Sequence, residues 1–412
     1  MKNARMTSKV IIPNGINCNK QYNINNIKVA HDTDIVYLIM TFTVSSKTLY
    51  EVFTTLSKVI APKNTLHILD DFIMRLENET LFVTAADTEN IMTASVAVTG
   101  EDDNGCFAIS AKNIMDGLKN MPDMMLTFNH EKNMLKVSYQ NGHFTMTTEN
   151  PDEFPLPHDF VPNINISMQE NILQENIARS IFATANDDLR PTINGIYFNL
   201  KEDALDIVAT NGHQLVRNRL FSIQATDNNK GGFIMPKKVV MILKNTLRKE
   251  NTSVNIISDF TWMTVSTENF TLHSRLVEGR YPNYNSVIPQ NNNNTLTVDR
   301  NNLIAVLKRI TPFSDGNSQL IKVNIQTNKL IVQAENFELS KTGTESMNAD
   351  YDGMEMNIGF KSSALLGVLE NINSTDVKML LSDQTRAGLI LPAVQPENQE
   401  VLMLLMPMLI ND

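Results

Sequence analysis

Short runs rich in Val, Ile, Thr and Phe recur along the chain, and several alternate between apolar and polar positions. Such runs are typical of β-strands, and the clearest are LFVTAAD, NMLKVSYQ, HFTMTTE, ALDIVAT, WMTVSTE, LIKVNIQ and KLIVQAE. Between them we predict six helical segments, at residues 45–60, 109–121, 168–184, 235–249, 298–311 and 361–372. This mixture predicts an α+β fold class.

The pattern repeats three times. An apolar residue stands five positions before a Leu in the pairs Val44 and Leu49, Met168 and Leu173, and Val298 and Leu303. The motif Leu-x-(Val/Ile)-x-Ala-x-(Asp/Asn) then begins at Leu81, Leu205 and Leu330, and a triplet LKN or LEN follows at 118–120, 243–245 and 369–371. Because the order and the spacing both recur, the sequence predicts three tandem copies of one domain of about 120 residues.

Two stretches without periodicity separate the copies. They are TENPDEFPLPHDF at 148–160, which contains three prolines, and PQNNNN at 289–294. Prolines and amides of this kind mark loops. We therefore predict domains at 40–158, 159–290 and 291–412, preceded by an N-terminal extension at 1–39 that is mobile or accessory.

The composition excludes several classes of protein. The chain has 412 residues, of which 42% are hydrophobic, but no apolar run reaches the roughly 18 residues of a membrane span. The N-terminus does not have the pattern of a signal peptide. Cys18 and Cys106 are the only cysteines and form no CxxC pair, so neither a disulfide framework nor a thiolate metal site is expected. These features predict a cytoplasmic protein.

Positive charge is concentrated in the predicted helices. The six segments contain fourteen Lys or Arg and six Asp or Glu, a net of +8, whereas the whole chain carries −10, so the remainder carries −18. In 235–249, Lys237, Lys244 and Arg248 fall on one helical stripe, and the apolar Val240, Leu243 and Leu247 fall on another. A solvated face explains one such helix. The recurrence of basic helices in all three copies instead favours a polyanionic partner, and a nucleic acid backbone is the commonest polyanion.

The kind of nucleic acid is also indicated. Few aromatic residues lie in the basic segments, so stacking on single-stranded bases is not expected. No recognition helix rich in Asn, Gln and Arg follows a tight turn. The sequence therefore predicts contact with the backbone of duplex DNA, without sequence specificity.

Catalytic chemistry has little support. His213 has no Ser, Cys or carboxylate partner at a recognisable spacing, and there is no GxxxxGK[ST] loop for ATP. The acidic EDDNG at 101–105 does not have the spacing of an EF-hand and is interpreted as a solvated turn. We predict a non-catalytic protein with no cofactor and no metal. The alternative is a DNA-modifying enzyme, such as a nuclease with a basic groove.

Four segments resemble the bacterial sliding clamp, the beta subunit of DNA polymerase III. They are FATANDDLRPTINGIYF at 182–198, ALDIVATNGHQLV at 204–216, SRLVEGRYPNYNSVIP at 274–289 and LLMPMLI at 404–410. The resemblance implies three clamp domains, each with two helices and two antiparallel sheets, and a homodimeric ring of six domains around duplex DNA. It also implies no catalysis, and partners that include the replicative polymerase, the clamp loader and other proteins with short clamp-binding peptides.

The dimensions of DNA agree with a dimer. A duplex is about 20 Å wide, and one water layer on each side gives a pore of about 35 Å and a circumference of about 110 Å. Helices packed at roughly 9 to 10 Å would need about twelve to line such a pore. One chain supplies six predicted helices, so two chains are expected, in the commonest closed symmetry.

The resemblance also implies site residues. Together with the charge pattern, it predicts DNA contacts at Lys63, Lys112, Lys119, Arg190, Lys237, Lys238, Lys244, Arg248, Arg300, Lys308 and Arg309. It predicts a peptide-binding cleft lined by Ile193, Thr210, Gly212, His213, Leu215, Pro282, Val287, Leu320, Met406, Pro407 and Met408. It predicts a dimer interface that contains Phe144, Met146 and Phe313.

The chain departs from the family pattern at five of its positions. Basic residues of the family are replaced by Ser286 and Leu409, and aromatic residues by Pro191, Thr192 and Ala364. Because these positions lie near the pore and the cleft of the family, we expect partner specificity to differ.

Overall fold

The computed structural model describes residues 40–100, 105–226 and 229–410. The N-terminal extension predicted at 1–39, and the acidic turn EDDNG apart from its glycine, lie outside the described residues.

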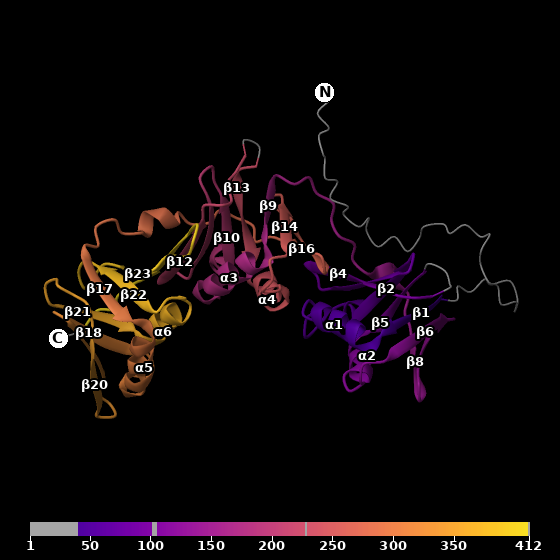
Figure 1. Ribbon diagram of the computed structural model, residues 1–412, viewed down its shortest axis with the longest axis horizontal. Coiled ribbons are helices and arrows are strands. Elements are labelled where there is room, and N and C mark those ends of the chain that lie inside the picture. Colours follow the sequence, from indigo (N-terminus) through magenta and orange to yellow (C-terminus); the bar gives the residue numbers. More distant parts are fainter. Residues whose placement is uncertain (1–39, 101–104, 227–228, 411–412) are drawn as a thin grey trace, which may run out of the picture. The chain divides into compact units, whose positions relative to one another are not determined.

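One order of elements, strand, helix, four strands, helix, three strands, occurs three times along the described chain (Figure 1). The first repeat consists of β1 Met40–Ser45, α1 Ser46–Leu56, β2 Asp71–Glu77, β3 Thr80–Ala86, β4 Asn90–Ala97, β5 Gly105–Ser110, α2 Ala111–Leu118, β6 Met125–Glu131, β7 Met134–Tyr139 and β8 Gly142–Thr147. The second consists of β9 Ile164–Gln169, α3 Glu170–Ser180, β10 Gly195–Leu200, β11 Leu205–Thr210, β12 Gln214–Leu220, β13 Gly231–Pro236, α4 Lys237–Thr246, β14 Ser253–Ser258, β15 Trp262–Ser266 and β16 Phe270–Arg275. The third consists of β17 Asn294–Asp299, α5 Arg300–Ile310, β18 Leu320–Gln326, β19 Lys329–Asn336, β20 Lys341–Asn348, β21 Met356–Lys361, α6 Ser362–Glu370, β22 Asp376–Leu381, β23 Gly388–Pro392 and β24 Gln399–Leu405.

The α+β fold class, the six helices and the seven strands predicted from the sequence are confirmed. Each helix is shorter than predicted, and three of them begin at a side-chain cap that periodicity does not reveal. Ser45, Ser110 and Asp299 each accept a hydrogen bond from the backbone N–H three residues later, which starts α1, α2 and α5.

The end of α4 corrects one prediction. Its apolar stripe is buried, since Val240 and Leu243 are fully covered, but the helix ends at Thr246 and Leu247 is extended. Arg248 therefore does not continue the helical stripe of Lys237 and Lys244. Its backbone N–H instead donates to the buried carboxylate of Glu170, at 2.9 Å.

By their contacts the repeats form two compact units. Unit 1 comprises the residues up to Phe160 together with Thr264–Ser274, and unit 2 comprises Val161–Met263 and Arg275 to the C-terminus. In unit 1, α1 and α2 pack together against strands of a four-stranded sheet, ordered β1-β6-β7-β8, and of the antiparallel series β5-β2-β3-β4-β16. Stacked rings fill its core, with centroids 4.8 Å apart for Phe42 and Phe128 and 4.7 Å apart for Phe53 and Phe72.

Unit 2 contains an eight-stranded sheet, ordered β13-β10-β11-β12-β24-β23-β22-β17, and a four-stranded sheet, ordered β20-β19-β18-β21. The pair β9 and β14 completes the second repeat. Helices α3 and α4 pack together, as do α5 and α6, each pair beside the strands of its own repeat (Figure 1). The helices therefore form three pairs, one in each repeat, and each pair packs on antiparallel strands.

Consecutive repeats are joined by the same two strand positions. The last strand of the second repeat, β16, pairs with β4, and the last strand of the third repeat, β24, pairs with β12. Both pairings are antiparallel. In the described part of the chain, two strands at these positions lie at the edge of a sheet and have a free side. They are β8, the last strand of the first repeat, and β20, which has the same position in the third repeat as β4 in the first and β12 in the second.

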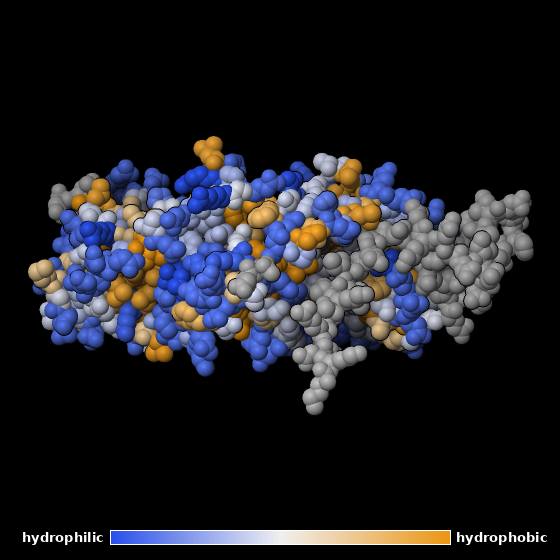
Figure 2. Space-filling model, turned by 90° about the horizontal axis from the view of Figure 1, so that it is seen from above, coloured by the Kyte–Doolittle hydropathy of each residue, from blue (hydrophilic) through white to orange (hydrophobic). Residues whose placement is uncertain are grey.

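On the face that Figure 2 shows, the described residues form no large apolar area. That face is mainly hydrophilic, and its hydrophobic side chains lie in small separate patches. Among the described residues, no helix is both long and apolar enough to cross a membrane.

Candidate functional site

A mainly apolar cavity of unit 2 lies where the second and third repeats meet. It measures about 580 Å³ and is lined by Leu189, Arg190, Pro191, Thr192, Ile193, Thr210, Gly212, Gln214, Leu215, Pro282, Asn283, Tyr284, Val287, Leu404 and Met406. These residues come from the short 3-10 helices η5 Pro191–Ile193 and η6 Tyr284–Val287, the β11–β12 turn and the end of β24. A cavity of this size, mostly apolar with a few polar groups, suits a short peptide or another small ligand.

The structure brings together seven of the eleven predicted cleft residues, namely Ile193, Thr210, Gly212, Leu215, Pro282, Val287 and Met406. It does not place His213, Leu320, Pro407 or Met408 in the lining. The reason is the path of the C-terminal segment, in which the Met406 N–H donates to the His213 carbonyl and the Met408 N–H donates to the Gly359 carbonyl. The second bond directs the chain along β21, next to Leu320 and away from the cavity.

Eight lining residues were not predicted for the cleft: Leu189, Arg190, Pro191, Thr192, Gln214, Asn283, Tyr284 and Leu404. The sequence did point to two of them, Pro191 and Thr192, because both replace aromatic residues of the family pattern. Arg190 was predicted to contact DNA, but it lies at the cavity, where its Nε donates to Asp187 at 2.8 Å. This hydrogen bond lowers the pKa of the Asp187 carboxyl.

Gly212 is required by its backbone. Its φ of +91° is strained for any residue with a side chain, and a Cβ there would lie 3.4 Å from Nη1 of Arg190. The β11–β12 turn therefore brings its backbone close to the arginine at the rim of the cavity.

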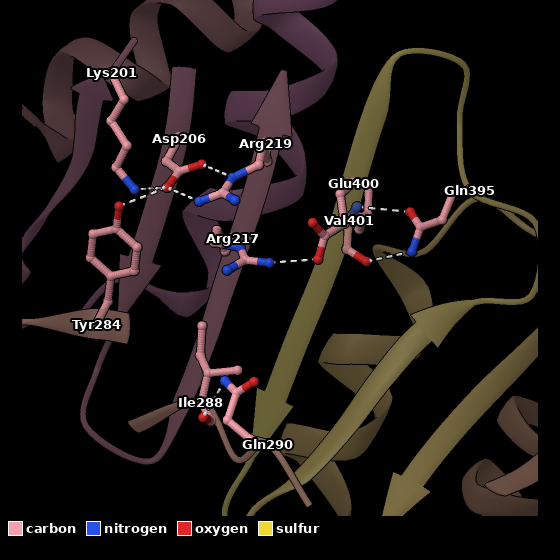
Figure 3. Close-up of polar contacts among 10 residues, drawn as sticks. All are labelled: Lys201, Asp206, Arg217, Arg219, Tyr284, Ile288, Gln290, Gln395, Glu400 and Val401. Atoms are coloured by element: carbon pink, nitrogen blue, oxygen red, sulfur yellow. Dashed lines mark hydrogen bonds and ion pairs between the residues drawn. The ribbon is translucent and has the colours of Figure 1, made fainter. Parts of the chain in front are cut away.

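A buried carboxylate holds one wall of the cavity in place (Figure 3). Asp206 on β11 is fully buried and accepts hydrogen bonds from Arg219 (2.7 and 3.0 Å), Lys201 (2.6 Å) and the Tyr284 hydroxyl (2.7 Å). The Tyr284 hydroxyl also accepts a hydrogen bond from Asn199, at 2.8 Å. Although burial by itself raises the pKa of Asp206, the hydrogen bonds from Arg219, Lys201 and Tyr284 outweigh it, so the pKa is lowered.

Aromatic packing makes the same wall rigid. The rings of Tyr197 and Tyr281 are stacked with centroids 4.6 Å apart, and Tyr284 meets Tyr197 edge-on at 6.3 Å. Burial raises the pKa of Tyr281, which stays neutral at physiological pH. The wall that carries η6 is thus preorganised before any ligand binds.

The opposite wall depends on β24. Across the β12–β24 pairing, Arg217 forms an ion pair with Glu400 at 2.5 Å (Figure 3). The Gln395 side chain bonds both backbone groups of Val401, accepting from its N–H at 2.8 Å and donating to its carbonyl at 3.0 Å. These contacts fix the strand whose last residues deliver Leu404 and Met406 to the cavity.

The other predicted DNA contacts lie at the surface of the helices or beside them. Lys112 and Lys119 are exposed on and just after α2, Lys63 is exposed in the loop that follows α1, and Arg248 is exposed beyond α4. Lys237, Lys238 and Lys244 on α4 and Arg300 at the start of α5 are half-buried. Their long side chains can bury their stems and still present a charged end to solvent.

Three of these basic residues have acidic partners, and one of them is Arg248, whose guanidinium lies 3.9 Å from a carboxylate oxygen of Glu250. Lys308 pairs with Glu370 of α6 at 2.7 Å, and Arg309 pairs with Glu345 of β20 at 2.5 Å. These pairs are solvent-exposed, so they contribute little stability. In the described structure Lys244 has no ion-pair partner, which makes it a stronger attractor of an anion than Lys308 or Arg309.

The predicted interface residues lie at the two free sheet edges. Phe144 and Met146 are half-buried on β8, where they alternate with exposed residues. Phe313 lies in η7 Thr311–Phe313 and packs against β20. Its ring is so close to Gly343 of that strand that a Cβ on the glycine would lie only 2.9 Å from it.

One cluster was not predicted at all. His67, Asp71 and Glu149 of unit 1 lie together, although 78 residues of the chain separate Asp71 from Glu149. Burial, and next the charge of Glu149, raise the pKa of Asp71 to about 6.

Family models of the DNA polymerase III beta subunit match most of the chain. The N-terminal domain matches residues 40–158, the central domain 167–283 and the C-terminal domain 285–409. The beta sliding clamp of Pseudomonas aeruginosa is 27% identical over 370 residues, which cover 90% of this chain and 100% of the relative. That of Escherichia coli K12 is 25% identical over 370 residues, with the same coverage.

Solved structures agree. A crystal structure of the DNA polymerase sliding clamp of P. aeruginosa has a TM-score of 0.85 at 27% identity and covers 90% of this chain and 100% of its own. The sliding clamp of Bacillus subtilis has a TM-score of 0.83 at 19% identity and covers the same fractions, which shows the shared fold.

We predict that Asp206→Asn destabilises unit 2 by about 3 to 5 kcal/mol at pH 7, because the half-buried Arg219 and Lys201 lose the buried carboxylate that is their counter-ion. Since the folded pKa of Asp206 is lowered, this stabilisation is complete above the unfolded pKa of about 3.9 and is lost as the pH falls through the folded value. Urea unfolding at pH 7 and at acid pH measures it. The difference between wild type and variant should shrink at acid pH, and Asp187→Asn, at an exposed pair, should change little.

Proposed function

Since the chain belongs to the family of bacterial DNA polymerase III beta subunits, the sliding clamps, we propose that two copies close head to tail into a ring around duplex DNA. The family is a non-catalytic processivity factor of DNA replication, so the alternative of a nuclease is not retained. In our proposal the ring tethers the replicative polymerase, the clamp loader and other clients through the cleft. It acts in the cytoplasm, and its domains are 40–158, 159–290 and 291–412.

The rule of strand pairing carries the proposal of a ring. Two junctions within the chain follow one rule, in which the last strand of a repeat pairs with the fourth strand of the preceding repeat. These pairs are β16 with β4 and β24 with β12. The two strands of these types that have free edges are β8 and β20. If β8 of one chain pairs with β20 of another, every junction becomes equivalent. Two such junctions close a twofold dimer and remove both edges.

The side chains at the two edges support this junction. Met146 and Phe144 present partly covered apolar surface on β8, and Phe313 is 38% exposed beside β20. Apolar side chains beside an unpaired edge are what the core of an interface needs, whereas isolated edges are usually protected by charge.

We predict that the protein is a dimer by light scattering at micromolar concentration, and that Met146→Asp or Phe313→Asp shifts it to the monomer mass. A carboxylate placed in the apolar junction would be desolvated without a partner. The control is Met354→Asp, because Met354 is 86% exposed and lies on neither edge. A wild-type monomer, or aspartate variants that remain dimeric, would contradict the junction.

The DNA surface that we propose comprises Lys63, Lys112, Lys119, Lys237, Lys238, Lys244, Arg248, Arg300, Lys308 and Arg309. Arg190 is instead assigned to the cleft. The support is the concentration of these residues on or beside one kind of element in a chain whose net charge is −10. Such a distribution attracts duplex DNA to the helices and repels it elsewhere.

We predict that Lys244→Glu with Arg248→Glu weakens retention on circular DNA at low salt and that the defect does not depend on DNA sequence. If each side chain neutralises one phosphate, the slope of log affinity against log salt should fall by about 2 in magnitude. The charge-matched control is Lys378→Glu with Arg386→Glu, at exposed positions on β22 and in the β22–β23 loop, away from the helices and from both free sheet edges. Equal retention by the Lys244→Glu, Arg248→Glu variant and wild type would leave these two side chains as solvated charges without a role in DNA binding.

For the cleft we propose a short extended peptide with a glutamine and bulky apolar residues, as the family resemblance implies. The support is the mainly apolar lining, in which Arg190, Thr210 and Gln214 are among the polar residues. The flexible thioether of Met406 lets one site accept different side chains. Polymerase and loader would therefore compete for it, each peptide binding with micromolar affinity.

We predict that deletion of residues 406–412 abolishes binding of a labelled clamp-binding peptide and leaves a folded dimer, because β24 ends at Leu405 and stays paired with β12. The point variant Met406→Ala should weaken binding, whereas Leu409→Ala, at a side chain that is 78% exposed and outside the cavity, should not. Fluorescence titration measures the affinity. Unchanged binding after the deletion would refute the cleft assignment.

A further inference from the structure

Three side chains able to bind a metal meet in unit 1. They are His67 in the 3-10 helix η2 His67–Asp70, Asp71 at the start of β2, and Glu149, which follows β8. One ligand atom from each lies within 4.8 Å of the others, and Nδ1 of His67 is 3.7 Å from a carboxylate oxygen of Glu149.

The backbone holds the cluster together through β5. Asp71 pairs in register with Ser110 of that strand. Glu149 forms two backbone hydrogen bonds with Ala108 of the same strand, at 2.9 and 3.0 Å. Asp71 and Glu149 thus lie on segments anchored to one strand, and His67 precedes Asp71 by four residues, in η2.

Asp71 is the unusual member. The residue is only 2% exposed, and within the part of the chain that the structure describes its carboxylate accepts no hydrogen bond. Its charged neighbours include the acidic Asp70 and Glu149, and His67 is the one able to carry positive charge. A buried carboxylate normally has a donor or a counter-ion, because burial without one is costly. A cation at this position would supply the missing partner.

We propose that His67, Asp71 and Glu149 bind one divalent transition-metal ion of the zinc class. An imidazole nitrogen with two carboxylate oxygens suits Zn²⁺, with water as the fourth ligand, whereas Mg²⁺ and Ca²⁺ prefer oxygen ligands alone. The site would join the start of β2 to the segment after β8. Its role is structural, since it braces unit 1 and needs no reaction.

Binding of Zn²⁺ requires the three ligand atoms to move closer together. Ligand atoms about 2.1 Å from a tetrahedral Zn²⁺ are roughly 3.4 Å apart, and the atoms of the cluster lie within 4.8 Å. The side chains of His67 and Glu149 are 75% and 52% exposed, so they are free to rotate toward the ion. Asp71 is fixed by burial and forms the preset side of the site.

The test uses the full chain, freed of metal with a chelator and titrated with Zn²⁺ alone by calorimetry at pH 7.5. We expect one Zn²⁺ per chain in wild type. Asp71→Asn and Glu149→Gln, which keep the side-chain shape, should each weaken binding by at least about tenfold to a hundredfold, because each removes a direct ligand and loss of an outer-shell partner alone has an effect of that size. Excess Mg²⁺ should not displace the ion. In wild type, Co²⁺ should give the visible absorption of a tetrahedral site, and this absorption should be lost in Asp71→Asn.

The matched control is Asp70→Asn. This carboxylate is adjacent in sequence but exposed, and it already accepts a hydrogen bond from Asn64 at 2.8 Å, so Zn²⁺ affinity should stay at the wild-type value. The proposal is overturned if wild type binds no Zn²⁺ at tens of micromolar metal. It is also overturned if Asp71→Asn and Glu149→Gln both bind Zn²⁺ as wild type does, because the ion would then be held elsewhere.

Discussion

Antiparallel pairing between the strands of consecutive repeats is the interaction on which the rest of the molecule depends. In unit 2 it runs over seven residue pairs, from Gln214 with Leu405 to Leu220 with Gln399, and merges two repeats into one eight-stranded sheet. Backbone hydrogen bonds of this kind are insensitive to side-chain identity, so the same junction can recur while the sequences of the repeats diverge. The ring that we propose adds no new kind of contact, because it uses the same junction between chains.

The cleft is a consequence of that junction. Its lining comes from both repeats and exists only because β24 lies beside β12 and delivers Leu404 and Met406 to the turn at Gly212. The chain reinforces the site with polar contacts on both sides, through Asp206 behind Tyr284 and through Arg217 and Glu400 across the strands. A site built in this way is preorganised, so less free energy is lost in ordering it when a peptide binds.

Charge serves a different purpose from packing. The basic helices add little to stability, since Lys308 and Arg309 form exposed ion pairs, and their concentration is better explained by a polyanionic partner. Buried charged side chains are fewer, and they stabilise the fold where hydrogen-bond donors surround them. Asp206 accepts hydrogen bonds from three residues, whereas Asp71 accepts none from the side chains of the described residues. This contrast between two buried carboxylates is the observation behind the metal site that we propose at Asp71.

The sequence by itself determined the elements and their repetition. The spacing of apolar residues located all six helices, and the five-residue interval of Val44 and Leu49 corresponds to a strand end followed by the first buried turn of a helix. Periodicity also identified the buried stripe of Val240 and Leu243, because local pattern and burial share one period. It missed the end of α4, beyond which the backbone N–H of Arg248 donates to the distant Glu170.

Only the tertiary structure decided which distant residues meet. It set Arg190 against Gly212, turned Met408 toward Gly359 and away from the cavity, and brought Glu149 to Asp71 across β5. No pattern along the chain encodes these contacts, since strand register fixes them, and register is settled by the packing of whole sheets. Sequence thus specifies what each segment becomes, while the pairing of segments far apart in the chain creates the sites.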